Sequence, residues 1–236
     1  MKSILLLLSA LLLHHTLQAQ IDLNSVVNTV NSALGNGLSN KEITDGLKQA
    51  LEIGSKNAGT KASKTDGYYK NSLIKIPFPS DARDMRKTLM NLGMKKQVEA
   101  FERQLNRAAE DAARKAAPIF IAAISKMTIN DGLVILRGKN DEATQFLKRN
   151  SQQQLAQAFR PVIGASLKKV EITKYWKPLF TRYNKLPMVK KVNPSLDDYV
   201  TQKAIEGLFK LVAEEETKIR KDPTARITEL LKKVFG

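Results

Sequence analysis

Apolar residues recur every three or four positions along most of the chain, and this spacing places side chains on one face of an α-helix. Ile43, Leu47 and Leu51 form one such face, and residues 196 to 219 repeat the pattern over a longer stretch. Strands would need strict alternation, which is rare here. The pattern therefore predicts an all-α fold, an irregular multi-helix bundle.

Polar residues mark where several of these helices begin and end. Ser39 followed by Glu42, and Thr128 followed by Asp131, have the spacing of a capping box, in which each side chain accepts a hydrogen bond from a free backbone N–H. Gly93 follows a periodic stretch and is placed to end a helix in a left-handed turn. These signals predict helices that start after Ser39 and Thr128 and one that ends near Gly93.

Other boundaries depend on single residues. Ser80 is expected to cap the helix that ends near Gly93. Pro118 and Pro161 lie inside helical patterns, and proline has no N–H to donate to the preceding turn. We therefore expect a kink or restart at Pro118 and an interruption near Pro161.

One segment, residues 72–79, departs from the helical pattern. It alternates apolar and polar residues and contains Pro77 and Pro79, which favour extended backbone. A short strand and a hydrophobic strap across helices both fit this pattern.

The N-terminus has the order of an export signal: a lysine, an apolar run from Ile4 to Leu13, and a small residue, Ala19, before a cleavage point. A membrane anchor is the alternative, but ten apolar residues fall short of the roughly 20 that cross a bilayer. We expect residues 1–19 to be removed and the rest, 20–236, to form a single helical domain that is periplasmic or secreted. Subdomains over 38–127 and 128–236 are possible divisions.

Histidine and cysteine are absent from the predicted mature chain, because His14 and His15 both lie in the signal and the sequence contains no cysteine. Di-iron sites with a Glu-x-x-His motif and zinc sites with Cys or His ligands are thereby excluded. We expect no cofactor and no metal.

The charge is strongly basic and unevenly distributed. The chain carries 39 Lys and Arg against 23 Asp and Glu, a net charge of +16. Residues 137–191 hold 13 basic residues against three acidic ones, together with the only tryptophan, Trp176. A basic segment with interleaved aromatics can hold anionic polymers, because cations attract phosphates while rings stack on sugars or bases.

We therefore predict an anion-binding surface in this segment. The candidate residues are Lys148, Arg149, Arg160, Lys168, Lys169, Lys174, Trp176, Lys177 and Arg182. In an exported protein the expected partners are anionic lipid, lipopolysaccharide or an acidic polymer, whereas the compartment argues against nucleic acid. The more ordinary interpretation is that the aromatics are core and the lysines keep the surface hydrated. The oligomeric state does not follow from the sequence.

An alternative function depends on carboxylates. Glu102, Asn106 and Glu110 lie four and eight positions apart, near one face of a helix, and Asp131 joins them only if the fold brings it close. Such a polar cluster is typical of a buried network that fixes helix packing, and it is also the one constellation that a carboxylate-dependent hydrolase would use. We expect binding rather than catalysis.

An acidic run near the C-terminus balances part of the basic charge. Glu214 with Lys218, and Glu216 with Arg220, stand four apart in the order that favours pairs on a helix surface. We interpret them as surface pairs rather than as a cation site or a docking surface for the basic segment of another copy.

Several short motifs occur in a fixed order along the mature chain. They are Asp66-Gly67-Tyr68 followed by Asn71, Ile74-Lys75-Ile76-Pro77-Phe78-Pro79, Leu105-Asn106-Arg107-Ala108-Ala109-Glu110, Met127-Thr128 with Asp131, Ala143-Thr144-Gln145-Phe146, Tyr199-Val200-Thr201, Gly207-Leu208-Phe209 and Leu230-Leu231-Lys232-Lys233-Val234-Phe235. In these motifs the chain resembles the family called domain of unknown function 4197, over essentially its whole mature length. The resemblance implies an exported, mostly helical bacterial protein and supplies no reaction. We expect a binding domain of the cell envelope.

Overall fold

The structure is a computed structural model that describes residues 38–169, 172–189 and 196–236. Residues Leu38–Gly236 form one compact unit. The predicted signal and its cleavage point lie outside the described residues.

Nine α-helices and two short 3-10 turns make up the described chain, and no strand occurs in it. The helices are α2 (Asn40–Ser63), α3 (Arg83–Asn91), α4 (Lys95–Ala113), α5 (Ala116–Ser125), α6 (Ile129–Arg137), α7 (Glu142–Lys169), α8 (Ile172–Asn184), α9 (Asp197–Lys221) and α10 (Glu229–Phe235). The turns are Ser80–Ala82 and Pro223–Ala225. The predicted all-α class is confirmed.

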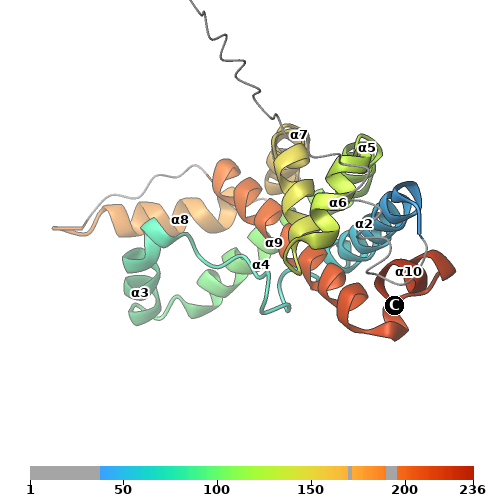
Figure 1. Cartoon of the computed structure of the whole chain (residues 1–236). Helices are drawn as coiled ribbons and strands as arrows, with labels where there is room; N and C mark the ends of the chain where they lie inside the picture. The colour runs from blue at the N-terminus through green and yellow to red at the C-terminus, as the bar shows by residue number, and fades with distance from the viewer. Residues whose placement is uncertain (1–37, 170–171, 190–195) are drawn as a thin grey trace, which may run out of the picture. The chain divides into compact units, whose positions relative to one another are not determined.

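Two long helices, α4 and α9, connect the ends of the unit. Helices α3 and α8 lie together at one end, while α2 and α10 lie together at the other (Figure 1). Helix α7 packs against both α4 and α9, and α2 packs against α4, α6 and α9. Helices on both sides of position 127 therefore share one hydrophobic core.

Both predicted capping boxes are present. Ser39 N–H donates to the Glu42 carboxylate over 2.8 Å, and Glu42 N–H donates to Ser39 Oγ over 3.2 Å. Thr128 and Asp131 repeat the arrangement at the start of α6. Gly93 has φ +75° after the end of α3, as predicted, because a left-handed residue there costs glycine nothing.

Two predicted boundaries are wrong. Ser80 begins a 3-10 turn instead of capping α3, which starts at Arg83 after Ala82 with no side-chain cap. Pro161 does not interrupt α7, which runs on from Glu142 to Lys169. Gln157 and Pro161 are both exposed, so water can reach the carbonyl that proline leaves without a partner.

The segment from residue 66 to residue 79, which we call the strap, consists of successive turns up to Ile74 and of irregular chain without turns from Lys75 onward. It is not a strand, but its predicted alternation holds, since Ile74, Ile76 and Phe78 are buried while Lys75 and Pro77 are exposed. The strap lies between α4 and α9, because Asn106 of α4 bonds to Ile76 while α9 bonds to residues at both ends of the segment.

No single helix in the described ranges is long and apolar enough to cross a membrane. Helices α5 and α6 pass that test of length and composition together, but they are bent by 106° at the break between them.

Candidate functional site

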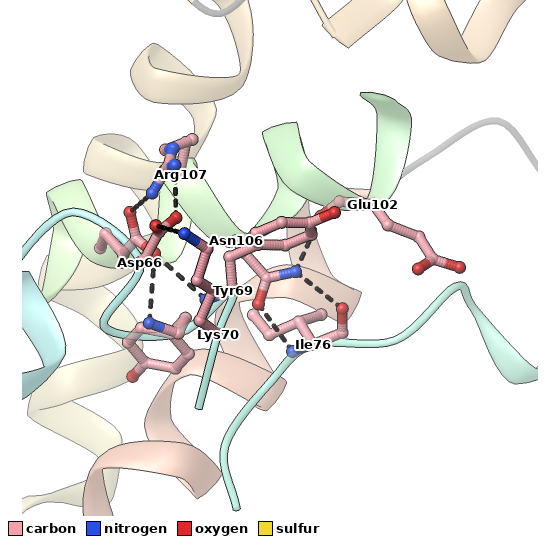
Figure 2. A network of polar contacts seen from close by, with 9 residues as sticks. Asp66, Tyr69, Lys70, Ile76, Glu102, Asn106 and Arg107 are labelled. Atoms are coloured by element: carbon pink, nitrogen blue, oxygen red, sulfur yellow. Dashed lines mark hydrogen bonds and ion pairs between the residues drawn. The ribbon is translucent and has the colours of Figure 1, made fainter. Parts of the chain in front are cut away.

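The polar residues predicted to share a face of α4 do so, and they face the strap. Asn106 is fully buried, and its side-chain amide makes two hydrogen bonds to the backbone of Ile76, as a neighbouring strand would. Oδ1 accepts from Ile76 N–H and Nδ2 donates to Ile76 O, each over 2.8 Å. Figure 2 shows the Asn106 side chain directed at the backbone of Ile76 from the helix beside it. One side chain thus replaces the missing partner strand.

The buried Glu110 carboxylate binds the start of the strap. Its Oε1 accepts from the backbone N–H groups of Tyr68 and Tyr69 over 3.1 and 3.2 Å, and its Oε2 accepts from Arg107 over 2.6 Å. The same guanidinium donates to Asp66 over 2.6 Å (Figure 2). Because three donors from the protein occupy this carboxylate, its role is structural: its hydrogen bonds go to the protein itself.

Asp66 closes this network at the surface. The Lys70 ammonium, 2.8 Å away, and then the Arg107 guanidinium hold the pKa of Asp66 below its ordinary value. The carboxylate is therefore ionised at neutral pH and holds the turn that begins the strap.

The other two residues of the predicted cluster do not join it. The Glu102 carboxylate points away from Asn106 (Figure 2). Arg86 Nε lies 2.7 Å from it and Lys75 Nζ 3.8 Å. Asp131 is on α6, where its carboxylate accepts from Thr128. Among the described residues no hydrogen bond links Asp131 to α4, so the four residues do not converge on one pocket.

A second buried carboxylate fixes α7 against α9. Glu216 accepts from the N–H groups of Ala143 and Thr144 over 3.0 and 2.7 Å, and so caps α7 from another helix. Its predicted pair with Arg220 is present at 2.9 Å, but it is buried rather than on the surface. Arg220 also donates to Ile135 O of α6.

Trp176 does not belong to a binding surface, and this part of the prediction is corrected. Only 3% of the residue is exposed, and its ring stacks on Phe101 with centroids 4.6 Å apart. Phe78 of the strap packs against the same ring at 5.6 Å. The spacing of aromatic residues along α8 therefore indicates residues that pack in the core between α4, α8 and the strap.

The predicted cations are exposed but do not share one face. By helix geometry Arg149 and Arg160 lie on one side of α7, whereas Lys148 and Lys168 lie about 160° apart around it, and Lys177 and Arg182 are on α8. Arg149 pairs with Glu142 at 3.3 Å and Arg160 with Asp198 at 2.7 Å. In the described residues the others make no ion pair, and the side chains of Lys169 and Lys174 lie outside what is described.

Two of these cations line an open groove between α7 and α9. The groove has a volume of about 460 Å³. Its walls are Lys148, Gln152, Ala156 and Arg160 from α7 and Asp198, Thr201, Gln202, Ile205, Glu206 and Phe209 from α9. The Arg160 to Asp198 pair closes one end, and Lys148 is about 18 Å away along α7 at 1.5 Å per residue.

The buried hydroxyl of Thr201 lines the groove and has no hydrogen-bond partner among the described residues. Thr201 is 4% exposed, and within the described structure its Oγ1 has no partner. Sequence reasoning missed Thr201, Gln152 and Gln202. The sequence feature that could have indicated the groove is the spacing by multiples of four of Lys148, Gln152 and Arg160 along α7.

A metal site is not evident in the part of the chain that the structure describes. No group of three or more His, Cys, Asp or Glu side chains is arranged there to hold an ion. The geometry is thus that of a polar groove beside a rigid, hydrogen-bonded scaffold.

Comparison with protein-family models gives one match, to the family described as protein of unknown function (DUF4197), over residues 37–236. The chain belongs to this family. No curated protein and no solved structure matches it. The matched range covers the whole compact unit described above.

Several of the motifs that carry the resemblance to DUF4197 meet at the strap. Tyr68 donates to Ala204 O of α9 over 2.6 Å, and Tyr199 donates to Pro77 O over 2.9 Å. Gly207 lies where an added Cβ would be 2.8 Å from the Tyr68 ring, so only glycine fits without movement. These motifs therefore hold the strap between α4 and α9.

Proposed function

We propose that this DUF4197 protein is a non-enzymatic binding domain of the cell envelope and that the groove between α7 and α9 holds an anionic ligand. One observation carries the proposal: two of the predicted cations, Lys148 and Arg160, line the same open groove as an unpaired buried hydroxyl, Thr201. Cations supply attraction to the ligand, and unpaired polar groups supply orientation.

The groove favours an elongated ligand. Lys148 and Arg160 are too far apart along α7 for one small anion to touch both. Gln152 and Gln202 lie between them and can donate or accept along the length of a chain. Arg160 is already paired with Asp198, but both side chains are largely exposed, so the pair contributes little and an anionic ligand can compete for the guanidinium.

Carboxylate chemistry has less support. Glu110 and Asn106 are engaged with the strap backbone, and Glu102 is paired with Arg86. A general acid or base has to reach a substrate proton, and these groups face inward.

Binding is tested with the chain from residue 20 and heparin oligosaccharides as a defined polyanion. Lys148→Gln/Arg160→Gln is compared with Lys56→Gln/Lys64→Gln, which removes the same charge from exposed lysines that make no ion pair among the described residues. We expect the groove variant to raise Kd about tenfold at low salt and the control less than twofold. Equal effects in both variants, or no binding by the unaltered chain, would contradict the proposal.

Export is the second part of the proposal, supported by the order of charged, apolar and small residues in positions 1–19. N-terminal sequencing of the protein recovered from the periplasm or medium should begin at Gln20. Recovery of the intact N-terminus Met1 from the cytoplasm would contradict it.

A further inference from the structure

Helix α6 presents apolar side chains to solvent on a face that no other described helix covers. Ile129 is 49% exposed and Val134 is 55% exposed, and Leu133 between them is half-buried. Ile129 and Leu133 are four positions apart and therefore lie one above the other, and Val134 follows Leu133 on the same exposed half of the helix. Six large apolar residues are exposed in the described chain, and two of them belong to this nine-residue helix.

The opposite side of α6 is fixed to the core, so the patch has a defined orientation. Gly132 is buried against α2, where an added Cβ would lie 2.5 Å from Thr44 Oγ1. Ile135 is buried as well, and its carbonyl accepts from Arg220 of α9 over 3.1 Å. The patch is therefore a rigid part of the fold.

Cations flank the patch at both ends. Lys126 precedes α6, while Arg137 and Lys139 end or follow it, and all three are exposed. Within the described residues none of the three makes an ion pair. An apolar centre with cations at its ends matches the charge and polarity of an anionic lipid surface.

The neighbouring carboxylates do not neutralise these cations by pairing. Asp131 accepts from Thr128 in the capping box, Asp141 accepts from Gln145, and Glu142 pairs with Arg149. The charges of Lys126, Arg137 and Lys139 therefore remain available to lipid phosphates.

We infer that α6 docks this protein on an anionic lipid surface, with Ile129, Leu133 and Val134 entering the headgroup region and the flanking cations contacting phosphates. The apolar residues of α5 are largely buried, so the contact is made by α6, and the 106° bend between the two helices suits a surface position rather than a straight span. The site shares no residue with the groove between α7 and α9, so this inference stands apart from the proposed function.

Cosedimentation with vesicles tests the inference, using the chain from residue 20 and vesicles of phosphatidylcholine with or without one quarter phosphatidylglycerol. Ile129→Ser/Val134→Ser should lower the partition coefficient on anionic vesicles about tenfold. Ile227→Ser is the matched control, since Ile227 is 69% exposed on another part of the chain and should leave partitioning within twofold.

Charge is tested by Lys126→Gln/Arg137→Gln/Lys139→Gln, which should weaken binding to anionic vesicles and abolish the preference over neutral ones. Lys148→Gln/Arg160→Gln should leave vesicle binding within twofold, so failure of the groove proposal is separable from failure of this one. Circular dichroism identifies variants that have lost the fold, and single Ile129→Ser or Val134→Ser then replaces the double variant. Unchanged partitioning of a folded Ile129→Ser variant, or equal binding to neutral and anionic vesicles, would overturn the inference.

Discussion

Asn106 and Ile76, 30 positions apart, exchange two hydrogen bonds of 2.8 Å in which a side-chain amide takes the place of a neighbouring strand. Both groups are buried, so each bond is protected from competition with water. The strap is held to α4 by this pair, and α9 closes over it through Tyr68 and Tyr199.

Replacing Asn106 tests how much this pair stabilises the fold. Asn106→Ala leaves the N–H and C=O of Ile76 buried without partners, and we expect the free energy of unfolding to fall by about 3 kcal/mol. Chemical denaturation followed by circular dichroism measures it. The control is Asn57→Ala, which removes an exposed bond to Glu215 and should cost less than about 0.5 kcal/mol. Similar losses in the two variants would show that the strap is not anchored as described.

Glycine has opposite roles in two helices, and alanine substitution separates them. Gly207→Ala places a Cβ 2.8 Å from Tyr68 and 3.1 Å from Ile74, so we expect a loss of about 2 kcal/mol. Gly59→Ala, in α2, meets no atom within 4 Å and should raise stability by about 1 kcal/mol through helix propensity. Thermal unfolding of both variants gives the comparison, and stabilisation by Gly207→Ala would contradict close packing of the strap on α9.

Much of the helical framework follows from the sequence, because its causes are local. The capping boxes at Ser39 and Thr128 and the left-handed Gly93 are decided by residues within one turn. The exceptions are Ser80, which begins a 3-10 turn instead of capping α3, and Pro161, where an exposed position lets the helix continue. Local rules state that proline disfavours the interior of a helix. They do not state whether water can reach the carbonyl that proline leaves without a partner.

The candidate sites could not be resolved in the same way, because their contacts join distant segments. Spacing places Glu102, Asn106 and Glu110 on one helix face. The strap, whose backbone N–H groups donate to Glu110 and Asn106, comes to lie beside that face only when the chain folds. Trp176 is similar: a ring in a basic segment fits a binding surface or a core, and only its stacking on Phe101 decides between them.

Burial and then the Glu110 carboxylate raise the pKa of Tyr68 far above its ordinary value of about 10. A raised pKa in the folded state gives stability that is complete below pH 10 and declines above it, as the tyrosine ionises in the unfolded chain. Tyr68→Phe should cost about 1 kcal/mol at pH 8 through the lost bond to Ala204, and the difference from the unaltered protein should shrink toward pH 11. Denaturation at both pH values checks this, and a constant difference would contradict it.

Thr201 separates stability from binding. Its buried hydroxyl has no partner in the described structure, so the isosteric change Thr201→Val should raise the free energy of unfolding by about 1 kcal/mol. The same change removes a group that a ligand in the groove would satisfy, and the Kd for a heparin oligosaccharide should rise several-fold. A variant that is more stable and binds equally well would exclude Thr201 from the ligand site.

Lysine footprinting tests the central claim, that an anionic ligand lies in the groove between α7 and α9, most directly. The chain from residue 20 is acylated with and without saturating heparin oligosaccharide, and the rate at each lysine is read by mass spectrometry. We predict that ligand slows modification of Lys148 several-fold while exposed Lys56 on α2 reacts at an unchanged rate. Unchanged reactivity of Lys148 in the ligand-bound protein would contradict the account.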